Sequence, residues 1–105
     1  MRKHGRTDSN QTRLVKAARE LGATVAILSS VGGGVPDLLI GCNGVNVLVE
    51  VKDGDKPPSK RKLTKDEQRF HDDWRGQVCV VESVTGMVVL VQEMRDARRP
   101  HTERD

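Results

Sequence analysis

The chain has 105 residues, enough for one domain, and its 31% charged and 35% hydrophobic residues are typical of a soluble globular protein. Aromatic residues make up only 2%, which argues against modules that stack nucleobases on rows of aromatic side chains. No apolar run approaches the roughly 20 residues of a membrane-spanning helix, and no apolar stretch follows the basic N-terminus as in a secretory signal. Two cysteines are too few for a disulfide scaffold, so we expect reduced thiols and a cytoplasmic protein.

The net charge of +3 does not identify a polyanion-binding protein, but the basic residues are unevenly distributed. Between positions 56 and 65 there is no acidic residue, and basic side chains follow one another closely. A charge run of this kind is usually a solvated loop, so a nucleic-acid partner needs independent support. The basic residues of this stretch are Lys56, Lys60, Arg61, Lys62 and Lys65.

The first expected element is a helix over residues 10–21. Asp8 or Ser9 can cap its start, and Gly22 suits the position just after its end. Residues 1–8 show no periodic pattern and are expected to form a flexible basic lead before a domain that covers residues 9–94. The apolar residues at helical intervals are Leu14, Ala17, Ala18 and Leu21.

A strand and a hairpin follow the first helix. Residues 23–31 are β-branched and apolar enough for a buried strand, and three consecutive glycines end it with an unusual backbone path. Asn43-Gly44 is a strong signal for a two-residue type I′ turn, which joins strands over residues 37–42 and 45–52.

The second half of the chain is predicted to hold a helix and two strands. Thr64 and Glu67 have capping-box spacing and open a helix in which Phe70 and Trp74 mark the buried face. Strands are expected over residues 77–83 and 87–92, with a turn at residues 85–86 between them, and the charged tail over residues 95–105 is expected to be disordered. The resulting order α-β-β-β-α-β-β describes an α/β fold with a mixed central sheet and two flanking helices.

The hairpin brings three charged residues together. If Asn43 and Gly44 are the two turn residues, Asp37 faces Glu50 across the strands, and Lys52 lies on the same face. The opposite face is wholly apolar and must belong to the core. That apolar face consists of Leu38, Ile40, Cys42, Val45, Val47, Val49 and Val51.

Two opposed carboxylates destabilise a sheet unless their charge is compensated. Lys52 supplies part of the compensation, and a divalent cation between Asp37 and Glu50 would supply the rest. Carboxylates with water suit Mg²⁺ or Mn²⁺. A cation held by these two residues and the Val51 carbonyl could polarise a phosphoryl oxygen, while Lys52 stabilises the charge that builds on phosphorus. The alternative that the pattern leaves open is a surface salt bridge among the three charged side chains.

Pro36-Asp37 followed by Glu50-Val51-Lys52 resembles the signature of the PD-(D/E)xK nucleases. The glycine-rich run before the hairpin and the order of helix, strand, hairpin, helix and strand are also similar to that superfamily's core. Within it the chain most resembles the small stand-alone VRR-NUC (virus-type replication-repair nuclease) domains, and beyond them the archaeal-type Holliday-junction resolvases. The resemblance covers residues 10–91 and implies a restriction-endonuclease-like core.

The resemblance also implies roles for individual residues. Asp37 and Glu50 would bind a catalytic Mg²⁺, for which Mn²⁺ can substitute, and Lys52 would assist the attack. Many family members carry an acid on the first helix; here Gln11 takes that place on the core-facing side, so the number of metal ions stays open. Gln68 resembles a polar position near the active site of relatives, although an exposed helix residue is the alternative.

These features together indicate a metal-dependent, structure-selective DNA endonuclease that is similar to a Holliday-junction resolvase. The basic residues between positions 56 and 65 leave the strand that carries Lys52, so we expect them to hold DNA phosphates without reading bases. The alternatives are a flap- or nick-type repair endonuclease and a non-catalytic DNA-binding module that keeps the fold.

The expected partner is branched DNA, and neither a membrane nor an organic cofactor is expected. Cutting two strands of a junction needs two sites, which predicts a homodimer. The apolar strand expected over residues 87–92 would offer a free edge for pairing, and the second helix could equally bury its aromatic residues across a two-fold axis. A solitary nuclease domain also suggests a phage-encoded protein that acts in the host cell.

Overall fold

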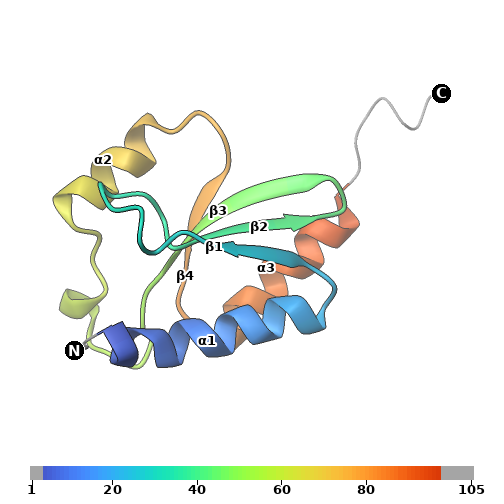
Figure 1. Ribbon diagram of the computed structural model, residues 1–105, viewed down its shortest axis with the longest axis horizontal. Helices are drawn as coiled ribbons and strands as arrows, with labels where there is room; N and C mark the ends of the chain where they lie inside the picture. Colours follow the sequence, from blue (N-terminus) through green and yellow to red (C-terminus); the bar gives the residue numbers. More distant parts are fainter. Residues whose placement is uncertain (1–3, 98–105) are drawn as a thin grey trace.

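The computed structural model describes residues 4–97, and side chains from Asn10 onward (Figure 1). Residues 1–3 of the predicted lead (residues 1–8) and residues 98–105 of the predicted tail (residues 95–105) lie outside the described residues. The elements in chain order are α1 (His4–Glu20), β1 (Thr24–Ile27), β2 (Leu38–Cys42), β3 (Val45–Val51), the 3₁₀ turn η1 (Pro58–Lys60), α2 (Lys65–Asp73), β4 (Val78–Val81) and α3 (Val84–Asp96).

The four strands form one mixed sheet in the order β1-β2-β3-β4. β1, β2 and β3 pair antiparallel, whereas β4 pairs parallel with β3. α1 and α3 lie together along one face of the sheet, and α2 lies apart from them on the other side (Figure 1). The prediction of an α/β fold with a mixed sheet is therefore confirmed, but within residues 4–97 three helices accompany the sheet instead of two.

The predicted hairpin is present with the predicted register. Cys42 pairs with Val45, and Leu38 pairs with Val49. Asn43 and Gly44 have φ angles of 56° and 76°, the two positive values that a type I′ turn requires. Because this register is fixed by the turn, it also fixes which side chains of β2 and β3 face the core.

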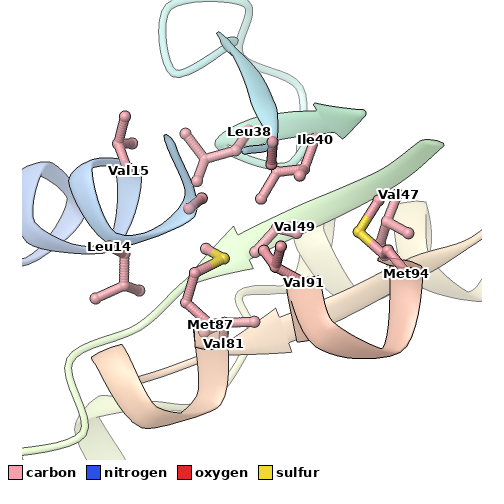
Figure 2. Packing of buried hydrophobic residues seen from close by; sticks show 12 residues of the cluster. Leu14, Val15, Leu38, Ile40, Val47, Val49, Val81, Met87, Val91 and Met94 are labelled. Atoms are coloured by element: carbon pink, nitrogen blue, oxygen red, sulfur yellow. The ribbon is translucent and has the colours of Figure 1, made fainter. Parts of the chain in front are cut away.

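The hydrophobic core lies between the sheet and the pair α1 and α3. The predicted apolar face of β2 and β3 supplies its centre, and in Figure 2 the side chains of α3 point toward the strand residues. α1 contributes a stripe with helical spacing, as its sequence predicts. The residues that are fully or almost fully buried here are Leu14, Ala18, Leu38, Ile40, Val47, Val49, Met87, Val91 and Met94.

The prediction of a strand over residues 87–92 is wrong, because these residues belong to α3. Met87, Val91 and Met94 are its buried residues, a spacing of four and three that follows a helix and not a strand. The expected turn at residues 85–86 is its first turn, where the Ser83 hydroxyl accepts a hydrogen bond from the Gly86 N–H at 3.0 Å. β-Branched composition favoured a strand, but capping and packing against the sheet favour the helix.

Three further predictions are corrected. α1 begins at His4, before the expected cap at Asp8 or Ser9, so the expected flexible lead is helical from that residue. β1 is shorter than predicted and is a largely exposed edge strand, with Ile27 55% exposed. Arg95 and Asp96, predicted to begin the disordered tail, complete α3.

The second helix carries the predicted capping box, but its aromatic residues do not belong to the core. The Thr64 hydroxyl accepts a hydrogen bond from the Glu67 N–H, and the Glu67 carboxylate accepts one from the Thr64 N–H. α2 nevertheless has no buried residue, and Trp74, which stacks on Phe70 at 5.1 Å between ring centroids, is 46% exposed. The helix therefore adds a polar and aromatic surface beside the sheet.

Candidate active site

The two predicted carboxylates lie at the end of the hairpin opposite its turn. Because Leu38 pairs with Val49, the register places Asp37 opposite Glu50. The Val51 N–H donates to Asp37 Oδ2 at 2.9 Å, and the Leu28 N–H donates to the Asp37 carbonyl at 2.7 Å. Asp37 is therefore fixed from both neighbouring strands, with its carboxylate directed at β3.

Glu50 is a buried carboxyl group with an unsatisfied oxygen. Glu50 is 4% exposed, and its Oε1 atom has no hydrogen-bond partner among the described residues. Burial, followed by repulsion from Asp37 and Glu67, raises the pKa of Glu50 to about 9 even though Lys52 acts in the opposite direction. Burial and the neighbouring negative charges therefore favour the protonated form of this carboxyl group.

Lys52 follows β3 and turns its ammonium group toward α2. Its Nζ lies 2.8 Å from Glu67 Oε1 and 3.9 Å from Glu50 Oε2, and its side chain is 15% exposed. Burial raises the pKa of Glu67, but the hydrogen bonds from Lys52 and the Thr64 N–H, together with the charge of Lys52 and an interaction with Glu50, bring the pKa of Glu67 below its ordinary value. The shorter contact is therefore an ionised pair between the β3 end and the first turn of α2.

The donor set at this end of the sheet fits a divalent cation. Asp37 and Glu67 both raise the pKa of Glu50 through their negative charge, whereas Lys52 alone opposes them, so negative charge is in excess around Glu50. No cluster of three or more His, Cys, Asp or Glu side chains that could hold a metal ion occurs within the described residues. Two carboxylates suffice for Mg²⁺, which usually keeps several waters and shares substrate phosphates. Asp37 and the unsatisfied Glu50 oxygen are the side-chain groups that would hold the ion; the Val51 carbonyl stays a prediction.

Two amides of α1 reach the same end of the sheet. Gln11 is 6% exposed, on the predicted core-facing side, and forms hydrogen bonds of 3.1 and 3.3 Å with the Ser29 hydroxyl. Ser29 follows Leu28, whose backbone pairs with Asp37. Asn10, which the sequence interpretation missed, is buried and donates from Nδ2 to the Lys52 carbonyl at 3.0 Å. α1 thereby ties the loop after β1 and the end of β3 to one helical turn.

The structure does not bring Gln68 into this cluster. It is exposed on α2, and its Nε2 donates to Asp72 Oδ1 at 2.9 Å, one turn further along the helix. A role near the active site therefore stays a prediction for Gln68, whereas Glu67, its neighbour, makes the contact with Lys52.

The predicted DNA-binding stretch is an exposed segment that contains η1. Its lysines are exposed, but Arg61 is engaged: Nη1 lies 3.1 Å from Glu82 Oε1, and Nε donates to the Lys56 carbonyl at 2.7 Å. The Gly54 N–H also donates to the Glu82 carbonyl. Arg61 thus anchors the stretch to Glu82, the residue after β4, whereas the side chains of the lysines are exposed to solvent.

The three consecutive glycines at residues 32–34, before the hairpin, bring α2 against the site. All three glycines have positive φ angles, and a Cβ atom at Gly34 would collide with the Asp66 carbonyl. The loop that leads to Asp37 therefore packs directly on the first turn of α2, which carries Glu67. The sequence signals for both segments were visible separately, as glycines and as a capping box, but their contact is tertiary and follows from neither.

The comparison with known proteins agrees with this geometry. No family model matches the sequence, and no curated protein matches it either. A solved structure titled "VRR_NUC domain" is 32% identical, with a TM-score of 0.55, over 81% of this chain and 92% of that chain. The chain belongs to the VRR_NUC family. The VRR-NUC resemblance of the sequence is thereby confirmed, the core is of the restriction-endonuclease-like α/β type, and the domain is of the nuclease type.

DNA is the substrate class that a VRR_NUC domain implies. Within residues 4–97, no helix has the length and apolar character needed to cross a membrane.

Proposed function

We propose that this VRR_NUC domain is a Mg²⁺-dependent, structure-selective DNA endonuclease whose catalytic residues are Asp37, Glu50 and Lys52. The observation that carries the proposal is their convergence at one end of the hairpin, on a nuclease-type fold, with a buried Glu50 oxygen left unsatisfied. A bound Mg²⁺ supplies Lewis-acid stabilisation of the phosphodiester that is cut.

The chain's own residues have separable roles in this proposal. Asp37, fixed by the Val51 N–H, and Glu50 hold the ion. Lys52 orients the attacking water and stabilises negative charge on the phosphoryl group. The exposed Lys56, Lys60, Lys62 and Lys65 hold the DNA backbone, which contributes affinity without base readout.

Branched DNA, with a four-way junction first, is the proposed substrate. Within residues 4–97, α1 and α3 pack against each other and the sheet, and the first turn of α2 carries Glu67, the partner of Lys52. None of these three helices is therefore assigned to base recognition. A flap or nicked duplex is the second candidate, and it requires only one active site for each cutting event.

The test is cleavage of labelled four-way junction, flap, nicked and linear duplex DNA in Mg²⁺, Mn²⁺ or EDTA. The wild type should cut branched DNA with either metal and not in EDTA. Asp37→Asn, Glu50→Gln and Lys52→Ala should each lose cleavage while DNA binding is retained. Glu20→Gln, in an exposed ion pair with Lys16, is the matched control and should cut normally.

Two outcomes would contradict the proposal. Normal Mg²⁺-dependent cleavage by Asp37→Asn would remove the assigned site. DNA binding by the wild type without cleavage of any of these substrates would instead indicate a binding module that keeps the nuclease fold.

A further inference from the structure

The pair between Lys52 and Glu67 links the proposed catalytic lysine to a helix outside the signature motif. Lys52 Nζ lies 1.1 Å closer to Glu67 Oε1 than to Glu50 Oε2, from the distances of 2.8 and 3.9 Å. Both members of the shorter pair are largely buried, at 15% and 20% side-chain exposure. A pair that is shielded from water in this way holds its partners more firmly than a surface ion pair does.

Glu67 is itself held in place by its own helix. Its Oε1 accepts the Thr64 N–H at 2.9 Å, and its N–H donates to the Thr64 hydroxyl at 3.2 Å. The oxygen that receives Lys52 is therefore the oxygen of the capping box. A carboxylate tied to the helix backbone offers Lys52 a fixed anchor, since its rotation is already restricted by the cap.

The alternative anchor for Lys52 is poor by comparison. Glu50 lies at a distance too long for a hydrogen bond, and its oxygens belong to the proposed cation site. If Lys52 moved onto Glu50, the ammonium group would compete with the cation for the same carboxylate. An anchor on α2 keeps the lysine beside the cation site without occupying it.

We propose that Glu67 is a positioning residue for Lys52, which it holds in place from the first turn of α2. This inference rests on the proposed endonuclease function for its kinetic consequence, but the coupling between the two side chains is independent of DNA and metal. It assigns Glu67, which the nuclease signature does not include, a role through Lys52 and not through contact with substrate.

The decisive variant is Glu67→Gln. Glutamine at this position still completes a capping box, so α2 should keep its start, while the ion pair with Lys52 is removed. We expect kcat on branched DNA to fall by about 10- to 100-fold, because misplacing a catalytic group by about 1 Å has an effect of that size. KM and the affinity for DNA should stay within about two-fold, because Glu67 holds no DNA phosphate.

Two controls separate positioning from helix capping. Thr64→Ala removes the hydroxyl of the cap but retains the carboxylate that holds Lys52, so it should lower the melting temperature and largely preserve kcat. If Thr64→Ala reduces kcat as much as Glu67→Gln does, the loss reflects helix integrity, and the positioning role is overturned. Wild-type kcat in a folded Glu67→Gln protein would overturn it as well.

A thermal double-mutant cycle tests the pair without substrate or metal. Melting temperatures in EDTA are compared for the wild type, Glu67→Gln, Lys52→Met and the double variant. A coupled pair predicts that the double variant loses less than the sum of the two single losses, and additive losses would overturn the inference. If the wild type cuts no DNA, the endonuclease proposal fails, and this cycle alone decides whether Glu67 holds Lys52.

Discussion

The Glu50 carboxyl group is buried and is repelled by two neighbouring carboxylates, which come from different parts of the chain. Asp37 faces it from the position directly before β2, Glu67 adds negative charge from α2, and Lys52 offsets only part of the effect. Removing a carboxylate from water without a hydrogen-bond partner is unfavourable, so the folded protein favours the protonated form in the absence of a cation. The residue that would bind metal is thus the one that destabilises the metal-free fold.

The first prediction is that the metal-free protein loses stability as the pH rises. The pKa of Glu50 is about 9 when folded and 4.5 when exposed, so the folded state binds more protons between these values. The free energy of unfolding should therefore fall with pH from about 5 to about 9, by up to about 1.4 kcal/mol per unit. Thermal melts in EDTA across this range measure the slope.

The matched variants for this prediction are Glu50→Gln and Glu20→Gln. The first removes the titrating group and should flatten the profile, whereas the second changes an exposed carboxylate and should leave the slope unchanged. A wild-type profile as flat as that of Glu50→Gln would mean that Glu50 is already ionised in the folded protein.

At the scale of single elements, the sequence predicts what local chemistry determines. The type I′ turn at Asn43-Gly44 sets the hairpin register, and through it the opposition of Asp37 and Glu50. The capping box at Thr64 places the start of α2 for the same reason. Both depend on residues within a few positions of each other, and their outcome does not require knowledge of the rest of the fold.

The sequence does not predict α3 or the contacts between distant residues, because both depend on tertiary packing. The residues of α3 are rich in valine, which favours a strand, yet the helix forms because one stripe packs on β2 and β3 (Figure 2). The contacts of Asn10 with β3 and of Glu67 with Lys52 join residues far apart in sequence. Asn10 could have been found from its spacing of four before Leu14, on the core-facing stripe of α1, but nothing local to Glu67 points to Lys52.

The second prediction distinguishes the helix from the strand in α3. A strand would place Met87 and Val89 on the same face, whereas the helix buries Met87 and leaves Val89 48% exposed. Met87→Ala should therefore lower the free energy of unfolding by about 2–5 kcal/mol, and Val89→Ala should change it by less than about 0.5 kcal/mol. Urea denaturation measures both, and losses of equal size would contradict the helical assignment.

The third prediction concerns the stretch that contains η1. Lys60 and Lys62 are exposed, whereas Arg61 is paired with Glu82. The double variant Lys60→Ala/Lys62→Ala should weaken binding to every DNA tested. It should also reduce the salt slope of log Kd by about 1 for each lysine that no longer neutralises a phosphate. Fluorescence anisotropy at several salt concentrations measures both effects.

Arg95→Ala is the control, because Arg95 lies at the turn end of the hairpin, where Asn43 contacts its carbonyl. It should leave both affinity and salt slope unchanged. A changed preference among DNA sequences at an unaltered salt slope would show that the lysines read bases, in contradiction to their proposed role.

At the scale of the whole molecule, the structure changes the argument for a homodimer. The expected edge at residues 87–92 does not exist, because those residues form α3 and bury Met87 and Val91 in the core. The edge strand β1 is partly blocked, since Arg19 Nη2 donates to the Val25 carbonyl at 3.2 Å. Of the two interfaces that the sequence suggests, the aromatic pair of α2 remains, where Trp74 is exposed and stacks on Phe70.

The last prediction is therefore a homodimer that buries Trp74. Two cuts in one junction require two sites, and an exposed tryptophan is the kind of side chain that anchors a protein interface. Light scattering at micromolar concentration should give twice the 11.6 kDa chain mass for the wild type and the monomer mass for Trp74→Glu. Val89→Glu, a similar charge on an exposed apolar position of α3, should remain dimeric. A wild type that is monomeric and still cleaves DNA would redirect the substrate from four-way junctions to flaps or nicks, since one Asp37–Glu50–Lys52 site is enough for a single cut.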